Sequence, residues 1–434
     1  MSRGIPCLLL LLVGTQAAAV AAPPRENAAR TSARAIAQAI GDQADGALKK
    51  FYATRGYWPL WAASGRIGPE AETLLGFLAT ADLDGLKPAS YQIPELRAAI
   101  RDARSGDPGK VAIAELELSR AFARYAADMR RPGGVKMTWL DRDLKPKALA
   151  AEVVLRGAGQ RSSLNAYVAD MGWMSAHYVR LRKLLALAKA RHAPQDSLER
   201  IRLNLDRARL LPGPWTRHIV VDAASARLFY YQDGKQQGMM RIVTGKAETP
   251  TPMLAGKLRY AILNPYWNVP TDLTRKKLAP KILAGASAQS MRFQALSDWS
   301  ASPVVLDPAT VDWQAVAAGR SKVRLRQLPG GDNAMGRVKY MFPNDQGIYL
   351  HDTPDKALMR KADRHFSNGC IRLEDAPRLG AWLFGKPLPK VKGAEQAAPL
   401  PAPVRVYLTY FTATPTEKGF GFLKDFYGRD GKGG

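Results

Sequence analysis

A change in hydrophobic pattern near residue 211 most constrains the fold of this chain. Before it, apolar residues recur at helical spacing, as in AELELSRAFARYAADM at 114–129. After it, segments such as RHIVVDAASARLFYYQDGKQQGMMRIVTG are rich in β-branched and aromatic residues, with Asp233 and Gly234 as a hairpin-turn signal. The stretch LPGPW at 211–215 separates the two patterns. The sequence therefore predicts an α+β protein, with an α-helical domain followed by a mostly β domain.

The same patterns predict the domain bounds. Residues 23–211 form the helical domain and 216–390 the β domain, in which 271–332 is a long, irregular and partly helical insertion. Insertions of this length in compact domains are often lids or binding loops. Residues 391–403 are predicted to be a Pro/Ala linker, and 404–434 a last strand and a loose tail. A length of 434 residues fits two or three domains.

The N-terminus has the pattern of a secretory signal peptide over residues 1–22. Arg3 precedes an apolar run that contains Cys7, and small residues allow cleavage after Ala19 or Ala22. An uncleaved anchor is the alternative, but the run is short for a bilayer-spanning helix, which needs about 20 apolar residues. We therefore expect an exported protein.

The net charge of +26 limits the partners of an exported chain. It favours an anionic wall or membrane surface, although the basic residues are dispersed and fit an ordinary solvated surface equally well. Nucleic acid is the weakest alternative, because only charge supports it and the export signal opposes it.

Cys370 is the one cysteine that remains after signal cleavage, in HFSNGCIRLED. A single cysteine is an intermolecular bridge, a buried bystander or a reactive thiol. A catalytic thiol needs a base, and His351, at the end of a predicted strand, is placed for that role better than His365. The amides of Gly369 and Cys370 are candidate oxyanion donors, and Arg372 is a candidate partner for the thiolate or for a substrate carboxylate. On spacing alone, a buried thiol and a turn histidine remain possible.

The segment GIYLHDTPDKALMRKADRHFSNGCIRLED resembles the signature of L,D-transpeptidases of the YkuD type. That signature is a His, a spacer and Ser/Thr-His-Gly-Cys, and Cys370 follows His351 by nineteen positions. The resemblance extends to TGKAETPTPMLAGKLRYAILNPYWNVP, RLRQLPGGDNAMGRVKYMFPN, VYLTYF and FYGRD. FYATRGYWPLW resembles the helical scaffold domain of the large Gram-negative members, which implies a periplasmic location.

The resemblance implies a cysteine acyltransferase that cross-links peptidoglycan stem peptides through a thioacyl intermediate at Cys370, with His351 as the base. It implies no metal or cofactor, and it implies carbapenems as covalent inhibitors. Ser367, Asn368 and Gly369 are the expected supports of the loop and oxyanion. The expected substrate-binding residues are Arg372, Trp267, Asn268, Tyr349 and Tyr340, with the insertion capping the groove.

Two departures from the family pattern affect the substrate. Asn368 stands where the family has its second His, and an amide cannot carry the proton. The small peptidoglycan-binding domain of many large relatives has no counterpart. We therefore lean towards 1-3 links (L-Ala to diaminopimelate), with L,D-carboxypeptidase activity on the side. The alternatives are 3-3 links or a non-catalytic peptidoglycan-binding protein. No papain-like or caspase-like context supports a protein-cleaving peptidase.

Overall fold

The computed structural model describes residues 24–131, 133–300, 302–391, 393 and 395–431. The predicted signal peptide, with Cys7, lies outside these residues. The chain divides into a smaller unit of residues up to 71 and 92–121, and a larger unit of 72–91 and from 122 onward. No helix in the described ranges is long and apolar enough to cross a membrane.

The smaller unit is mainly helical. It contains α1 (Pro24–Gln43), α2 (Gly46–Ala53), α4 (Ile93–Asp102), the first part of α5 (Pro108–Met129), and the hairpin of β1 (Ala62–Ala63) and β2 (Arg66–Ile67). Glu115 is fully buried and accepts hydrogen bonds from the Tyr52 hydroxyl at 2.6 Å and the Ala62 amide at 2.9 Å. Burial raises the pKa of this carboxyl, and the hydrogen bonds oppose that rise.

The helices of the larger unit confirm the helical prediction for the N-terminal half. They include α6 (Ala151–Gly159), α7 (Leu164–Ala169), α8 (Ala176–Ala190) and α9 (Gln195–Arg209), and α3 (Glu70–Ala79) belongs largely to them. Ser163 and Ser175 cap α7 and α8, because each side-chain oxygen accepts a backbone amide of the first turn.

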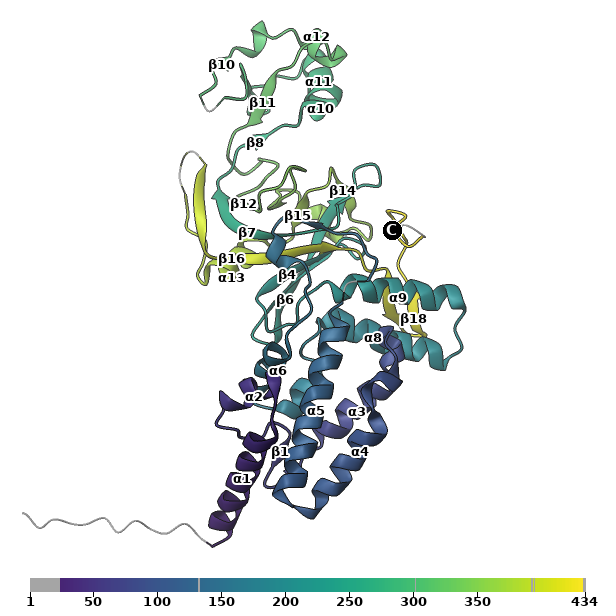
Figure 1. The fold of residues 1–434 in the computed structure, drawn as a ribbon. Coiled ribbons are helices and arrows are strands. Elements are labelled where there is room, and N and C mark those ends of the chain that lie inside the picture. The colour runs from purple at the N-terminus through teal and green to yellow at the C-terminus, as the bar shows by residue number, and fades with distance from the viewer. Residues whose placement is uncertain (1–23, 132, 301, 392, 394, 432–434) are drawn as a thin grey trace, which may run out of the picture. The chain divides into compact units, whose positions relative to one another are not determined.

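A ten-stranded sheet forms the core of the larger unit (Figure 1). Its order is β12-β13-β15-β6-β5-β4-β16-β7-β3, with β14 paired to β6, and a pairing of β12 with β7 closes it on itself. The bounds are β3 (Thr138–Trp139), β4 (His218–Asp222), β5 (Arg227–Gln232), β6 (Lys235–Gly245), β7 (Leu254–Leu263), β12 (Val338–Met341), β13 (Leu350–His351), β14 (His365–Ser367), β15 (Ile371–Leu373) and β16 (Gln396–Thr409).

The predicted hairpin turn between β5 and β6 is confirmed. Asp233 and Gly234 both have positive φ, at 53° and 79°, as the two-residue type I′ turn requires. The helix α13 (Ala376–Phe384) follows Cys370, and its local sequence supplies both of its ends. Asp375 accepts the Arg378 amide at 3.0 Å, and Gly385 ends the helix with φ 69°.

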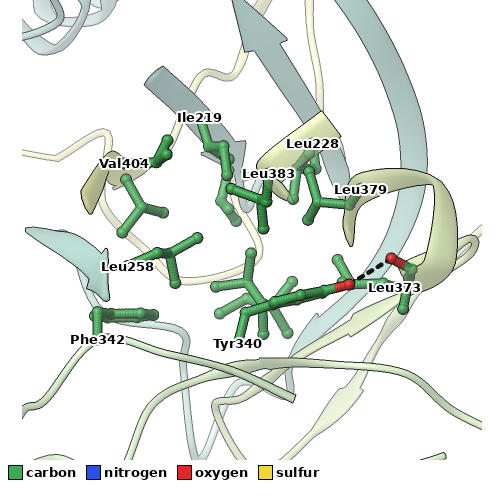
Figure 2. Packing of buried hydrophobic residues seen from close by; sticks show 14 of the residues in the cluster. Ile219, Leu228, Leu258, Tyr340, Phe342, Leu373, Leu379, Leu383 and Val404 are labelled. Carbon is green, nitrogen blue, oxygen red and sulfur yellow. Dashed lines mark hydrogen bonds between the residues drawn. The ribbon is translucent and has the colours of Figure 1, made fainter. Parts of the chain in front are cut away.

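The main core fills the space between this sheet and α13. Leu379 and Leu383 of α13 pack against sheet residues such as Ile219, Leu258 and Val404 (Figure 2). This packing anchors the strand ends that carry the candidate site.

The insertion folds around a small core of its own. Its short strands pair in the order β10-β9-β11-β8, and its helices include α10 (Thr271–Leu273), α11 (Ala279–Leu283) and α12 (Trp313–Ala318). The strands are β8 (Trp267–Asn268), β9 (Phe293–Leu296), β10 (Val305–Leu306) and β11 (Arg324–Gln327). The partly helical prediction holds, and the four-stranded sheet is an addition to it.

The predicted linker is wrong from Gln396 onward. The Pro/Ala stretch is the first half of β16, which lies between β4 and β7 in the sheet. Its ladder with β7 is interrupted between Pro399 and Val404, because prolines lack the amide that a strand pair needs. The last strand is therefore an inner strand of the sheet of the predicted catalytic domain, which extends beyond residue 390.

The C-terminal segment is also more ordered than predicted. After the hairpin of β17 (Ala413–Thr416) and β18 (Gly419–Phe422), the Asp430 carboxylate binds Arg207 at 2.8 Å and accepts the Thr412 hydroxyl at 2.6 Å. The description of YGRDGKGG as a loose tail is thus wrong up to Gly431.

Candidate active site

Two parallel strands bring the predicted nucleophile and base to one face of the sheet. Cys370 directly precedes β15, and His351 ends β13. These strands pair with His351 opposite Arg372. Because side chains alternate along a strand, Tyr349 and His351 on one strand and Cys370 and Arg372 on the other project from the same face. Four of the predicted site residues therefore come together.

The thiol of Cys370 is half-buried and has two neighbours. Its Sγ donates to the carbonyl of Gly347 at 3.4 Å. The backbone and the hydroxyl of Tyr349 also hydrogen-bond to the sulfur. Burial raises the pKa of the Cys370 thiol, while the Tyr349 hydrogen bonds and the Arg372 charge lower it by less. The resting thiol is therefore protonated at neutral pH.

The ring of His351 is buried and oriented by the backbone. Its Nδ1 lies 2.6 Å from the carbonyl of Asp352, and a carbonyl only accepts, so Nδ1 carries the proton and Nε2 is the basic atom. Burial, and then the Arg372 charge, lowers the pKa of His351 to about 3. The imidazole is therefore neutral and ready to accept a proton.

A short rearrangement separates this resting geometry from proton transfer. Within the described residues no hydrogen bond joins His351 to Cys370, and one two-residue strand step, about 7 Å, separates their positions along the face. The Tyr349 ring packs edge-on to the His351 ring, with centroids 5.6 Å apart. The thiol must turn from Gly347 towards Nε2, a tightening common when substrate binds.

The raised thiol pKa predicts the pH dependence of alkylation. In a chain that begins at residue 23, iodoacetamide should label Cys370 slowly at pH 7, with the rate rising about tenfold per pH unit to beyond the ordinary pKa of 9.0. Arg372→Gln should move this profile further towards alkaline pH, because a charge that favours thiolate is lost, and Arg372→Lys should move it less. Fast labelling that is constant between pH 5 and 8 would show a preformed thiolate and contradict the assignment.

The loop before the thiol is held by Ser367. Its Oγ donates to the carbonyl of Cys370 at 2.6 Å and accepts the amide of Gly369 at 3.1 Å. Gly369 has φ 111°, a conformation that favours glycine. The Gly369 amide is thus already used, which corrects its role as an oxyanion donor. The Cys370 amide has no protein acceptor among the described residues and remains as that donor. Asn368 is exposed.

A threonine that the sequence did not single out holds the same loop from the other side. Thr251 is fully buried; its Oγ1 donates to the carbonyl of Gly369 at 2.8 Å and accepts the amide of Gly245 at 2.9 Å. Thr249 adds a bond to the Ser367 carbonyl at 3.3 Å. The only available signal was the position of TPTP within the family-like segment.

Removal of the Thr251 hydroxyl is expected to misplace the nucleophile. Thr251→Val should lower kcat about 10- to 100-fold, because the loop carrying Cys370 loses its anchor and a displacement of about 1 Å has effects of that size. Thr251→Ser keeps the hydroxyl and should stay within about twofold of the parent. The two variants are compared by turnover and by circular dichroism; equal losses in both would point to a methyl-packing role instead.

Tyr340 is a core residue, so its predicted substrate-binding role is wrong. The side chain is fully buried, and its hydroxyl donates to the carbonyl of Ala376 at 2.7 Å (Figure 2). It lies on β12, whose register directs it into the hydrophobic core. Alternation along a strand shows which residues share a face, but it does not show which of the two faces packs into the core.

Tyr340→Phe separates the two roles. Loss of one buried hydrogen bond should lower the free energy of unfolding by about 1 kcal/mol and leave kcat/KM per folded molecule unchanged. Urea denaturation and steady-state kinetics measure the two quantities. A raised KM with unchanged stability would restore the substrate role.

Trp267 and Asn268 have structural roles in the insertion. Trp267 packs against the insertion core, 6.2 Å from the ring of Phe293, and the Asn268 Oδ1 accepts Arg324 Nη2 at 3.1 Å. Both side chains are also partly exposed, so their substrate-binding role stays a prediction. The neighbouring Tyr266 is partly exposed under the guanidinium of Arg326.

His365 is held by contacts with other parts of the chain. Its Nδ1 binds Asp363 at 2.6 Å, its Nε2 lies 2.9 Å from the carbonyl of Ala223, and its ring stacks on Phe426 at 4.3 Å. It does not replace the missing family histidine.

Comparisons with known proteins match two regions of the chain to family models. Residues 216–387 match the family model of the L,D-transpeptidase catalytic domain, YkuD, and residues 46–185 match the scaffold domain. A Haemophilus influenzae protein named "Putative L,D-transpeptidase" is 26% identical over 395 residues, which cover 88% of this chain and 78% of that protein.

Solved structures are more distant. The avibactam carbamoyl enzyme of Ldtfm is 16% identical, with a TM-score of 0.21, over 46% of this chain and 49% of that one. An L,D-transpeptidase from Mycobacterium smegmatis is 14% identical, with a TM-score of 0.22, over 44% of this chain and 58% of that one. The chain thus spans about half the length of these solved chains.

A scaffold domain followed by a β-rich domain that matches the L,D-transpeptidase catalytic model defines the class of this chain. The chain belongs to the YkuD-type L,D-transpeptidases, with the helical scaffold domain found in their larger members, and it is an enzyme.

Proposed function

We propose that this enzyme cross-links peptidoglycan stem peptides in the periplasm through a thioacyl intermediate on Cys370. The observation that carries the proposal is that Cys370 and His351 lie on the same face of the sheet. Nδ1 of His351 binds a backbone carbonyl, which leaves Nε2 as the basic atom. The wall is also the anionic exported partner that the net charge of +26 favours.

The first half-reaction forms the thioester. Nε2 of His351 accepts the thiol proton as the sulfur attacks a stem-peptide amide carbonyl, and the Cys370 amide donates to the developing oxyanion. Collapse of the tetrahedral intermediate breaks the C–N bond, and the leaving amine takes the proton from Nε2. A neutral thiol on Cys370 and a neutral imidazole on His351 suit this order of steps, because the thiolate then forms only as the sulfur attacks.

The second half-reaction transfers the acyl group. An amine of a second stem loses a proton to Nε2 and attacks the thioester, which releases the thiol and makes the cross-link. Water in place of the amine gives L,D-carboxypeptidase activity. Asn368, exposed where relatives carry a histidine, supports an altered donor pocket and is the reason that we favour 1-3 links over 3-3 links.

Muropeptide mass spectrometry tests the proposal. Purified protein and Cys370→Ala are incubated with sacculi of several stem lengths, and fragmentation identifies the donor residue. Cysteine-dependent dimers support a transpeptidase, with the donor at position 1 or 3 deciding the link type. Loss of a terminal D-residue without dimers would mean a carboxypeptidase. No change with either protein would leave a wall-binding function, and thiol acylation by a carbapenem measures nucleophile competence independently.

A further inference from the structure

A basic cleft lies apart from the residues that surround the thiol. Its volume is ≈ 850 Å³, and three cations line it: Lys136, Lys145 and Arg429. None of the described residues that line it is acidic, and neither Cys370 nor His351 takes part. The cleft is thus an electropositive site separate from the catalytic face.

The cations of the cleft have capacity for a ligand. Lys136 and Lys145 are exposed, and neither forms an ion pair with any residue that the structure describes. One terminal nitrogen of Arg429, Nη1, is buried and has no hydrogen-bond partner. The Arg429 guanidinium lies over the rings of Tyr410 and Tyr427, and its positive charge adds to that of the two exposed lysines at the cleft.

The nearby acidic groups are already engaged. Asp430 binds Arg207 at 2.8 Å and Arg200 at 2.5 Å, and the Asp425 Oδ1 accepts the backbone amide of Arg429 at 2.9 Å. They hold the segment in place and leave Nη1 of Arg429 unsatisfied.

The remaining walls of the cleft are largely apolar. Trp139, Met137 and Met253 contribute partly buried side chains beside the cations. A volume of this size and a mixture of apolar surface with a few charged groups are typical of sites for small molecules or peptide segments.

The cleft borders the support of the nucleophile loop. The other terminal nitrogen of Arg429, Nη2, donates to the carbonyl of Thr251 at 3.0 Å, and the Thr251 hydroxyl holds Gly369. A ligand on Arg429 therefore lies two hydrogen bonds from the loop that carries Cys370.

We propose that this cleft docks the enzyme on the wall by binding the carboxylates of a non-reacting stem peptide. The inference rests on the proposed peptidoglycan function, and it gives the enzyme a wall-binding surface separate from its catalytic face. Carboxylates fit because they are the anionic groups that stem peptides present, and the apolar walls accommodate the uncharged peptide part.

Sedimentation with sacculi tests docking without catalysis. The full-length Cys370→Ala protein is compared with Cys370→Ala carrying Lys136→Glu and Lys145→Glu. We expect the apparent Kd for sacculi to rise about tenfold in the cleft variant. Lys147→Glu with Lys87→Glu makes the same charge change on exposed lysines outside the cleft lining, and it should have a much smaller effect.

Two further measurements identify the ligand. Sacculi whose carboxylates are blocked as amides should lose the cleft-dependent binding. Equal binding by blocked sacculi, or equal losses in the cleft and control variants, would overturn the proposal. Displacement by inorganic phosphate, at concentrations where chloride of equal ionic strength has no effect, would assign the cleft to phosphate and also overturn it.

Turnover on soluble muropeptides separates this inference from the proposed function. With an intact Cys370, the cleft variant should keep the parental kcat on soluble substrate while losing activity on sacculi. Binding to sacculi that the cleft substitutions weaken, together with no product that requires Cys370, would support the docking site and contradict the transpeptidase assignment.

Discussion

His351→Ala is expected to lower the rate of thioacyl-enzyme formation by about 10²- to 10⁴-fold, the usual contribution of a positioned general base. The thiol pKa is raised by burial, so without Nε2 little thiolate forms near neutral pH. Because burial lowers the pKa of His351 to about 3, the base stays unprotonated through the acid range, and kcat/KM should fall on the acid side only as pH approaches that value.

The acylation rate is measured in single-turnover experiments by intact-protein mass spectrometry. His365→Ala is the matched control, since that histidine lies close to the thiol in sequence and its ring nitrogens contact Asp363 and Ala223. The control should acylate at a rate near that of the parent once corrected for folded protein. A loss below tenfold in His351→Ala, or an equal loss in the control, would contradict the base assignment.

Asp84→Ala is expected to destabilise the larger unit by about 3–5 kcal/mol, the usual effect of breaking a buried ion pair from one side. The Asp84 carboxylate is buried and accepts Arg182 Nε at 2.9 Å, the Tyr125 hydroxyl at 2.7 Å and the Tyr178 hydroxyl at 2.8 Å. Its removal leaves the buried Arg182 guanidinium without a counter-charge and two phenols without acceptors.

Urea denaturation followed by far-UV circular dichroism measures this effect. Asp82→Ala is the control, because Asp82 pairs with Lys189 and both side chains are well exposed. Loss of this ion pair should lower the free energy of unfolding by about 1 kcal/mol or less. Similar shifts in the two variants would show that the Asp84 network contributes little to stability.

Local sequence was sufficient where neighbours along the chain decide the structure. The turn at Asp233 and Gly234, and the Asp375 cap and Gly385 end of α13, depend on backbone preferences of a few residues. Cys370 and His351 were found because thiol chemistry limits which residue types can act, and because the spacing matched a family signature.

Local sequence was insufficient to predict features that depend on pairing or packing with distant parts of the chain. The Pro/Ala stretch that begins β16 has weak strand propensity, and its pairing with β7 depends on a segment more than a hundred residues away. Trp267 and Tyr340 are aromatic residues near family-like motifs, but a pattern of alternation does not predict that Trp267 packs on the insertion core and Tyr340 in the main core.

The sequence by itself determined the α+β class and the order of helical and β regions, because these follow from periodicity, and it singled out Cys370 and His351 as the candidate nucleophile and base from side-chain chemistry and a family signature. Only the tertiary structure decided which amide remains for the oxyanion, that Thr251 holds the nucleophile loop, and that the thiol and imidazole rest uncharged. These properties arise from burial and from hydrogen bonds between residues far apart in the chain, and neither is encoded in a local pattern.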